Sequence, residues 1–153
     1  MCAVADPLIK TIVIGASCEH VFDFIVQPSN MVRWLGLAVE FEAVPGGALR
    51  IDPNGRDVIH GTVLEVTRPS KIVFTWGWEG AEHAVPAGST IVEIVLTPEG
   101  AGTRLTLVHR DLPADARENH DVGWTHYLAR LQIVAEGGDA GRDPLADPGV
   151  RHG

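Results

Sequence analysis

The sequence predicts an α+β domain in which a curved antiparallel sheet of about seven strands wraps around a long C-terminal helix, with two short helices after the first strand. Three observations predict it: short β-branched runs between turn residues, two short helical patterns near the N-terminus, and one long helical pattern near the C-terminus. A chain of 153 residues suits one domain. We expect an N-terminal arm over 1–7, the domain over 8–136, and a mobile tail over 137–153, which is rich in Pro, Gly and Asp.

The first strand is predicted over 8–14, where β-branched residues dominate the run LIKTIVI. Helical spacing follows in ASCEHVFDFIV, with Ser17 as the expected N-cap. Pro28 interrupts this helix, and Ser29 is expected to cap a second short one. These two helices separate the first strand from the rest of the sheet.

Six further strands are predicted from short β-rich runs that lie between turn signals such as Pro45-Gly46-Gly47 and Pro53-Asn54-Gly55. Short connections between consecutive runs predict antiparallel pairing. The predicted runs are AVEFEAV (38–44), ALRID (48–52), VIHGTVLEV (58–66), KIVFTWGW (71–78), STIVEIVL (89–96) and TRLTLVH (103–109).

Alternation along these strands predicts which side chains face the long helix. On 58–66, the charged Glu65 marks its own face as outward, which places the other set on the inner face, namely His60, Thr62, Leu64 and Val66. The inner residues expected on the later strands are Ile72, Phe74, Trp76, Thr90, Val92, Ile94, Leu96, Leu105, Leu107 and His109. An apolar inner surface with scattered polar groups is typical of a small-molecule pocket and also of a filled core, and the sequence leaves both open.

The long helix is predicted over 115–136, where apolar residues recur at helical spacing until two glycines end the pattern. The members of this stripe are Trp124, Tyr127, Leu128, Leu131, Val134 and Ala135. The stripe must be buried, and the sheet is the surface that can bury it.

Charge and composition narrow the range of partners. The net charge of −8 disfavours nucleic acid and anionic membrane surfaces, so we expect no nucleic-acid partner. No apolar run approaches the roughly 18 residues of a membrane span, and we expect no membrane insertion. Two cysteines are too few for a disulfide framework, and the N-terminus lacks a signal-peptide pattern, so a cytoplasmic protein is predicted.

Three histidines are the candidate polar groups of the inner surface. His60 and His109 lie on predicted strands, and His120 precedes Trp124 by one helical turn, so the three could meet near one end of the helix. They could act as general bases or be core histidines bonded to the backbone, and the sequence leaves both open. Since no HExxH, CxxC or GxSxG motif is present, we assign no metal, no cofactor and no catalytic residue.

The order of these segments resembles the SRPBCC or START-like helix-grip superfamily, in the branch of activator of heat-shock protein 90 ATPase homologues. The resemblance covers residues 8–136 and is carried by ASCEHVFDFIV, MVRWLG, PGGALRID, GTVLEVTRPSKIVFTWGWEG, STIVEIVLTPEGAGTRLTLVHRDLP and HDVGWTHYLARL. It implies an apolar cavity between the sheet and the last helix that holds a lipid, a polyketide or another hydrophobic small molecule. One fold of this kind serves many functions, so the ligand has to be argued from the site.

The resemblance and the inner-face pattern together predict a protein that binds a hydrophobic small molecule in an internal cavity. Trp34, beside Met31 on the second short helix, would cover the cavity mouth in this fold. The predicted ligand-binding residues are Trp34, His60, Phe74, Trp76, Leu105, His109, His120, Trp124 and Leu128.

Two other functions are weighed against ligand binding. A polyketide cyclase or aromatase-like enzyme would use a pocket histidine or carboxylate to move protons. A co-chaperone that stimulates the heat-shock protein 90 ATPase is the least expected, because only seven residues precede the first strand and the namesake also uses a separate N-terminal domain. An exposed edge strand at ALRID would leave a homodimer open.

Overall fold

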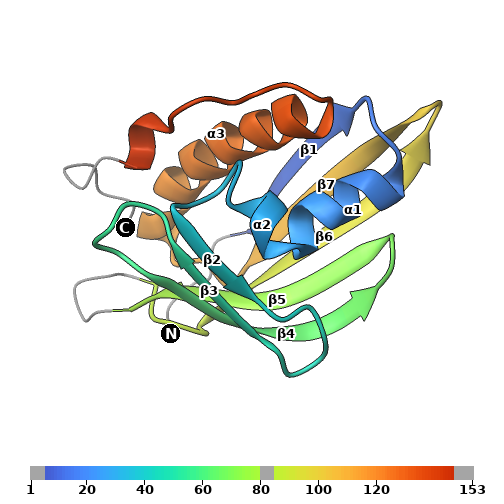
Figure 1. Ribbon diagram of the computed structural model, residues 1–153. Helices are drawn as coiled ribbons and strands as arrows, with labels where there is room; N and C mark the ends of the chain where they lie inside the picture. The colour runs from blue at the N-terminus through green and yellow to red at the C-terminus, as the bar shows by residue number, and fades with distance from the viewer. Residues whose placement is uncertain (1–5, 80–84, 147–153) are drawn as a thin grey trace.

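The computed structural model describes residues 6–79 and 85–146, and within them the chain forms a seven-stranded antiparallel sheet (Figure 1). The strand order is β1-β7-β6-β5-β4-β3-β2, so the strands that follow one another along the chain from β2 to β7 are also neighbours in the sheet. The strands are β1 (Leu8–Ile14), β2 (Ala38–Phe41), β3 (Ala48–Asp52), β4 (Ile59–Thr67), β5 (Lys71–Trp78), β6 (Thr90–Glu99) and β7 (Gly102–Arg110). The predicted α+β class and strand number are confirmed.

The helices cover one face of this curved sheet. In Figure 1, α3 and α1 lie across the concave side, and the sheet bends around them. The helices are α1 (Cys18–Val26), α2 (Pro28–Met31) and α3 (Arg117–Ala135), with 3-10 turns η1 (Ala114–Ala116) and η2 (Pro144–Ala146). The helix-grip arrangement predicted from the element order is confirmed. No helix in the described part of the chain is long and apolar enough to cross a membrane.

The N-terminal caps of the short helices confirm one expectation and correct another. Ser17 caps α1 as predicted, because its hydroxyl accepts the backbone N–H of His20 at 3.2 Å. The predicted Ser29 cap is wrong, since α2 begins one residue earlier, at Pro28, and Gln27 occupies the cap position. Proline suits the first helical position because its fixed φ is helical and it has no N–H to leave unbonded.

The inner face of β4 differs from the prediction, and the cause is a β-bulge. Val63 faces Phe74 and Glu65 faces Val73, so the register shifts between Val63 and Glu65. An extra residue reverses the alternation, and counting back from Glu65 therefore assigns the wrong face to the earlier half of the strand. Ile59 and Val63 are buried, whereas Thr62 and Leu64 are exposed.

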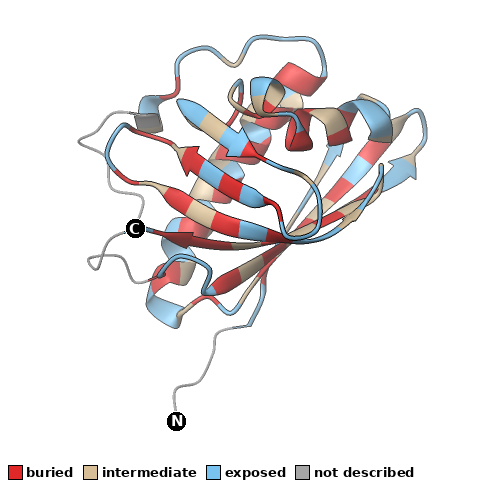
Figure 2. Cartoon of the chain, turned by 60° about the horizontal axis from the view of Figure 1, so that its bottom comes forward, coloured by how far each residue is buried: buried red, intermediate tan, exposed pale blue. Residues whose placement is uncertain are grey.

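His60 is consequently not an inner residue. Its side chain is 40% exposed, and its Nε2 lies 2.7 Å from Oε1 of Glu79, which directly follows β5. The predicted inward orientation of His60 is wrong for the same reason as that of Thr62: both precede the bulge, and Leu64 is the extra residue within it. On the strands without a bulge the predicted inner sets are confirmed, and Figure 2 shows the alternation of buried and exposed residues.

The ALRID segment is not an edge strand. It forms β3, which pairs with β2 through Leu49 and Phe41 on one side and with β4 on the other. The outer strands of the described sheet are β1 and β2. The short strand β2, with the sequence AVEF, pairs with the edge of β3 that was expected to be exposed and available to a second copy of the chain.

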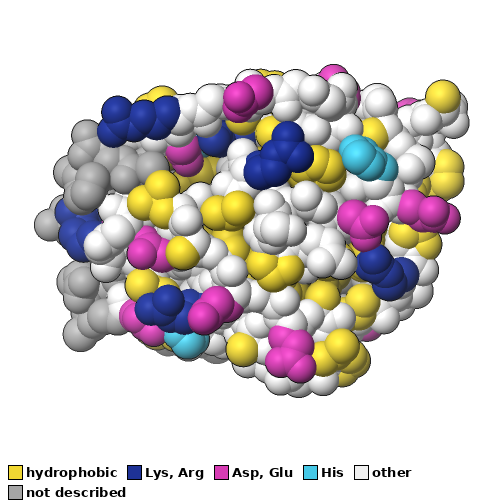
Figure 3. Space-filling view, in the orientation of Figure 1, with side chains coloured by type: hydrophobic (Ala, Val, Ile, Leu, Met, Phe, Trp, Pro, Cys, Tyr) yellow, Lys and Arg dark blue, Asp and Glu magenta, His cyan; other side chains and the backbone are white. Residues whose placement is uncertain are grey.

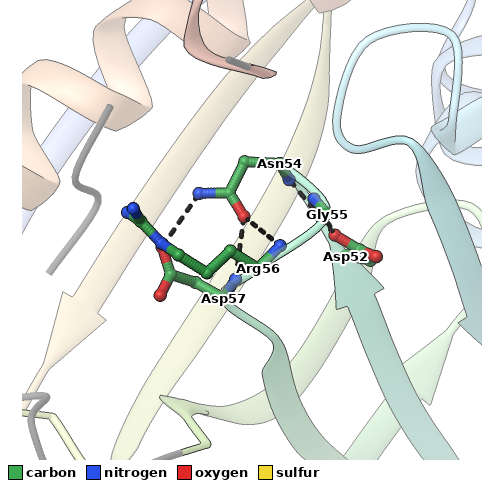
Figure 4. A network of polar contacts seen from close by, with 5 residues as sticks. All are labelled: Asp52, Asn54, Gly55, Arg56 and Asp57. Atoms are coloured by element: carbon green, nitrogen blue, oxygen red, sulfur yellow. Dashed lines mark hydrogen bonds and ion pairs between the residues drawn. The ribbon is translucent and has the colours of Figure 1, made fainter. Parts of the chain in front are cut away.

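Side chains hold the turn between β3 and β4 in place (Figure 4). Oδ1 of the fully buried Asn54 accepts the backbone N–H groups of Arg56 and Asp57 at 2.9 and 2.8 Å, and its Nδ2 donates to Oδ2 of Asp57 at 2.8 Å. Asp52 Oδ1 accepts the Asn54 N–H at 3.2 Å. The turn thus satisfies its own buried polar groups and fixes where β4 begins, at Ile59.

The segment after α3 returns along that helix toward its N-terminal half, as the red trace in Figure 1 shows. Side chains of α3 hold it there: Arg130 Nη2 donates to the Gly141 carbonyl at 2.9 Å, and His126 Nε2 lies 2.7 Å from Asp143 Oδ1. Hereafter this part of the chain, 137–146, is the C-terminal segment. The predicted division into arm (1–7), domain and mobile tail stays a prediction, and residues 1–5 and 147–153 lie outside the described part.

Candidate functional site

A partly open cavity of about 180 Å³ lies between the sheet and the first half of α3. Strands β4 and β5 form one wall, α3 forms the other, and the C-terminal segment contributes Leu145. The lining residues are Ile59, Trp76, Trp78, Glu118, Asn119, His120, Val122, Gly123, Trp124, Tyr127 and Leu145. Aromatic and aliphatic side chains dominate this wall, and a few polar groups accompany them, as in most small-molecule sites.

Two tryptophans line the cavity because they are two residues apart at the end of β5, with Gly77 between them. Residues two apart on a strand share a face, so Trp76 and Trp78 both point to the concave side. Gly77 between them lies against the next chain segment, where an added Cβ would come within 1.8 Å of the Pro86 carbonyl oxygen. The glycine thereby allows this close backbone approach beside the two indoles.

The aromatic rings of the site form one contiguous cluster. The ring centroids of Trp76 and Trp124 are 4.9 Å apart, and His109 stands edge-on to Trp76 at 6.0 Å. Trp78 meets Trp76 edge-on at 6.5 Å. These separations are the ones that aromatic pairs prefer, so the cavity has a rigid aromatic floor.

His109 sits behind this floor in a closed chain of hydrogen bonds. Trp124 Nε1 donates to Nδ1 of His109 at 3.0 Å, so Nδ1 carries a lone pair and the proton belongs on Nε2. Nε2 lies 2.8 Å from the Thr90 hydroxyl, which in turn donates to the Trp76 carbonyl at 2.6 Å. With the proton on Nε2, every donor in this chain has one acceptor. A second proton on His109, at Nδ1, would point at the Trp124 N–H.

Burial, and to a smaller extent the neighbouring His120, lower the pKa of His109 from 6.5 to about 3. The fully buried imidazole is therefore neutral at physiological pH. With both ring nitrogens committed, His109 supports the Trp76 and Trp124 rings and has no free position for a proton from a ligand.

His120 lies on the cavity wall itself, in the first turns of α3. Its Nδ1 is 2.9 Å from the Ala116 carbonyl and so carries the proton, which leaves Nε2 to accept the Trp78 indole N–H at 3.4 Å. The imidazole is buried, with its ring centroid 5.3 Å from that of His109. His120 thus couples the start of α3 to the end of β5.

Trp76 differs from its neighbours in its hydrogen bonding. The residue is 4% exposed, and its indole Nε1 is buried with no hydrogen-bond partner among the described residues. An unpaired donor that is removed from water costs roughly 1–3 kcal/mol. One residue of the cavity wall therefore contains a buried donor whose bonding the described residues leave incomplete.

Tyr127 forms the side of the cavity nearest the C-terminal segment. Burial raises the pKa of its phenol above the ordinary value, Asp143 raises it further, and Arg130 opposes the shift. The ring of His126 lies against Tyr127 at a centroid separation of 5.1 Å. The phenol stays protonated at physiological pH and adds a polar point to an apolar wall.

The structure brings three of the predicted ligand-binding residues to the cavity, namely Trp76, His120 and Trp124. His109 lies behind them through its bond to Trp124. Phe74, Leu105, Leu128 and Trp34 are buried in the hydrophobic core and do not line this cavity, and His60 is on the other face of the sheet. Their role in ligand binding stays a prediction.

Trp34 is held as a core residue. It is 1% exposed, and its indole Nε1 donates to the Phe24 carbonyl at 2.8 Å. Its own carbonyl accepts from Arg130 Nε at 3.3 Å. These bonds tie the end of the α2 region to α1 and α3, on a part of the fold away from the cavity.

Several lining residues were not predicted from the sequence, and Gly123 is the most informative of them. A glycine inside a helix is unfavourable by about 1 kcal/mol relative to alanine, so an isolated one beside Trp124 is a signal for a close approach or an open space. An added Cβ at Gly123 would meet nothing within 4 Å. Leu145 carried no such signal, because it belongs to a segment without periodicity.

Replacing Thr90 by valine is expected to destabilise the protein by about 1–3 kcal/mol, because the buried Nε2–H of His109 loses its acceptor while the shape of the side chain is kept. Chemical denaturation of both proteins measures this difference. Thr106→Val on the half-buried side of β7 is the matched control, and an equal loss there would contradict the assignment.

Among the described residues, no three His, Cys, Asp or Glu side chains gather closely enough to hold a metal ion. The polar groups of the lining residues are indole N–H groups, one imidazole, one phenol, the carboxylate of Glu118 and the amide of Asn119. This set can bind and orient an apolar molecule through a few hydrogen bonds.

Comparison with known proteins identifies the family of this fold. An AHSA1-like protein from Rhizobium etli is 34% identical, with a TM-score of 0.71, and the match covers 99% of this chain and 96% of that one. DynU16, from the dynemicin biosynthetic locus, is 20% identical with a TM-score of 0.79; the match covers 91% of this chain but only 50% of DynU16. The Aha1 dimer from Colwellia psychrerythraea is 18% identical with a TM-score of 0.75, covering 88% of this chain and 98% of that one.

No curated protein matches the sequence. The model of the family described as activator of Hsp90 ATPase homolog 1-like protein matches residues 15–136, which span α1 to the end of α3. The match includes Trp76, Trp78 and the lining part of α3. This chain belongs to the activator of Hsp90 ATPase homolog 1-like family.

Proposed function

We propose that this protein binds a hydrophobic small molecule in the cavity between β5 and α3. The observation that carries the proposal is the cavity itself: about 180 Å³ in volume, partly open, and floored by packed indole rings. Burial of apolar ligand surface there contributes about 25 cal/mol for each Å² removed from water. The SRPBCC fold of the chain agrees with this function, since the sequence resemblance implies a ligand space at the same place.

The volume supports a ligand portion of about one ring. An apolar protein cavity of about 150 Å³ takes up benzene, and the cavity here is of similar size. A lipid tail or a fused polyketide needs more room, which displacement of Leu145 and the C-terminal segment would supply. We therefore propose a single-ring ligand, or the single-ring end of a larger one.

An enzyme similar to the polyketide cyclases and aromatases is the alternative. Its requirement is a cavity group that accepts a proton, and His120 is the wall residue of that type. The ring nitrogens of His109 are both hydrogen-bonded, Nδ1 to Trp124 and Nε2 to Thr90. The low pKa of His109 makes it a very weak base. The Nδ1 of His120 is likewise bonded to the Ala116 carbonyl, and its Nε2 accepts the Trp78 indole N–H. The hydrogen bonds of both histidines favour binding over catalysis.

The partners expected from the sequence remain predictions. The family name refers to activation of the Hsp90 ATPase, and we still expect no chaperone partner. The Colwellia structure is a dimer, and in this chain β1 and β2 are the outer strands at which a second copy would pair. Figure 3 shows basic side chains scattered among acidic ones on the face it presents, in keeping with the expectation of no nucleic-acid partner. A cytoplasmic location stays a prediction.

Gly123→Leu is the variant that tests the binding function. The new side chain would extend from α3 into open space at the cavity wall and occupy volume that the ligand needs. We expect toluene, styrene and acetophenone to stabilise the wild-type protein, with about 2.7 kcal/mol at 100 times the dissociation constant, and not the variant. Thermal shift and calorimetric titration measure this.

Thr125→Leu is the matched control, because Thr125 is an exposed residue of the same helix that does not line the cavity. It should leave binding unchanged. If none of the three compounds shifts the wild-type melting temperature, or if Gly123→Leu binds them as well as wild type does, the proposal is wrong.

A further inference from the structure

We propose that the protein has a second binding site, a groove that takes the phosphate group of a small organic phosphate. The groove has a volume of about 460 Å³ and lies between the turn after α2 and the C-terminal segment, beside the second half of α3. Arg33, Arg130 and Arg142 line it. The groove shares no lining residue with the cavity between the sheet and α3, so this site goes beyond the proposed function.

The three arginines of the groove differ from most basic side chains of the protein, because no carboxylate in the described part of the chain forms an ion pair with them. Most of the other described Lys and Arg side chains have such a partner, in the pairs Lys10–Asp121, Arg56–Asp57, Arg68–Asp23, Lys71–Glu65, Arg104–Glu99 and Arg110–Glu93. The chain as a whole carries a net charge of −8. Three guanidinium groups without a carboxylate partner around one groove are therefore available to an anion.

Arg130 is held in place before a ligand binds. Its Nε donates to the Trp34 carbonyl at 3.3 Å. Its Nη1 and Nη2 donate to the carbonyls of Ala140 and Gly141 at 3.1 and 2.9 Å. A guanidinium has five N–H donors, so two of them remain for another acceptor. A side chain that is already ordered loses little conformational entropy when a ligand binds to it.

Arg33 and Arg142 belong to the two walls of the groove. Arg33 follows α2, and Arg142 belongs to the C-terminal segment; both are exposed. The Arg33 guanidinium lies over the Phe24 ring, with Cζ 5.2 Å from the ring centroid, and this contact uses none of its N–H groups in a hydrogen bond to oxygen. A guanidinium can donate two parallel hydrogen bonds to a phosphate, so both side chains can contact one phosphate group.

Two carboxylates in the groove restrict the kind of anion that can bind. Asp139 Oδ1 accepts the Gly141 N–H at 2.8 Å, and Asp143 Oδ1 lies 2.7 Å from His126 Nε2. Their negative charge opposes any anion, so only one that contacts several guanidinium groups at once overcomes the repulsion. A phosphate monoester has about −1.5 to −2 charges and three terminal oxygens. A carboxylate has one charge and two oxygens.

Apolar side chains beside the arginines favour an organic phosphate over inorganic phosphate. Leu37, which is 55% exposed, and the partly buried Val32 line the groove next to Arg33. An alkyl group attached to the phosphate would cover this exposed apolar surface, and its removal from water would add to the affinity.

The probes for this site are n-butyl phosphate, pentanoate and n-butanol, which share a butyl group and differ in charge. We expect saturable binding of n-butyl phosphate, about fivefold tighter than that of pentanoate, and none of n-butanol at the groove. Raising the salt concentration from about 0.1 to about 1 M shortens the Debye length from roughly 10 to roughly 3 Å and should weaken the binding of n-butyl phosphate. Isothermal titration calorimetry measures these affinities.

Arg33→Gln and Arg142→Gln should each weaken n-butyl phosphate binding about fivefold, the upper end for an exposed ion pair. Both side chains are exposed, so these variants keep the hydrophobic core. Arg50→Gln is the matched control, because Arg50 is an exposed residue of β3 that also forms no ion pair with a described carboxylate and does not line the groove. It changes the net charge by the same amount and should leave binding unchanged.

A measurement on the wild-type protein locates the bound phosphate directly. In ¹H–¹⁵N spectra, n-butyl phosphate should shift the backbone amide signals of Gly36, Leu37 and Gly141 in the groove and leave those of Gly123 and Trp124 at the cavity in place. Absence of saturable binding up to about 10 mM, an equal effect of all three glutamine variants, or shifts confined to the cavity residues would overturn this proposal. None of these outcomes would alter the expected binding of one-ring compounds in the cavity.

Discussion

Lowering the pH from 6.5 to 3 is expected to remove roughly 4–5 kcal/mol of stability through His109 alone. The pKa of this imidazole is 6.5 in the unfolded chain and about 3 in the folded protein, so between these values only the unfolded state takes up the proton. The stability from neutral His109 is complete above pH 6.5 and falls by about 1.4 kcal/mol for each pH unit below it. Denaturant unfolding at several pH values measures this slope.

His109→Gln isolates this contribution from that of the surface carboxylates, which also lose their ion pairs in acid. Glutamine offers an amide donor and an acceptor but does not titrate. The variant should be less stable at pH 7. Its free energy of unfolding should depend less steeply on pH than that of the wild type, and the difference in slope should correspond to at most one proton taken up on unfolding. A variant with the same slope as wild type would show that His109 is protonated in the folded state.

Trp34→Ala is expected to lower the free energy of unfolding by about 3–5 kcal/mol, which is the range for a fully buried tryptophan cut back to alanine. The side chain is 1% exposed and its N–H is bonded to the Phe24 carbonyl, so the change leaves both a void and an unpaired carbonyl. Equilibrium unfolding in urea measures the loss.

The same residue tests the prediction that Trp34 covers a ligand. If Trp34 is a core residue, Trp34→Phe should lose stability but bind the one-ring compounds with unchanged affinity, because Trp34 does not line the cavity. A lid residue would behave in the opposite way, with affinity lost and stability kept. Leu64→Ala serves as a control for the stability measurement, since Leu64 is exposed.

Local signals in the chain were sufficient for the order and type of its elements. LIKTIVI became β1 with the predicted bounds, and the helical stripe from Trp124 to Ala135 is buried as the spacing requires. These predictions succeeded because periodicity and turn residues act within a few positions of one another.

The errors have a common physical origin in contacts between distant segments. The bulge after Val63 depends on the pairing of β4 with β5, and it reversed the expected face of His60. The edge position expected for ALRID was lost because β2 pairs with it. The sequence of a single strand contains no pattern that predicts either pairing.

The sequence by itself determined that a curved sheet would hold one long amphipathic helix, and it identified Trp76, His120 and Trp124 as inner residues. Only the tertiary structure decided which inner residues fill the core and which border open space. That outcome depends on how β5, the first half of α3 and Leu145 approach one another. Close packing depends on the distances between side chains from separate segments, and these distances exist only once the chain has folded.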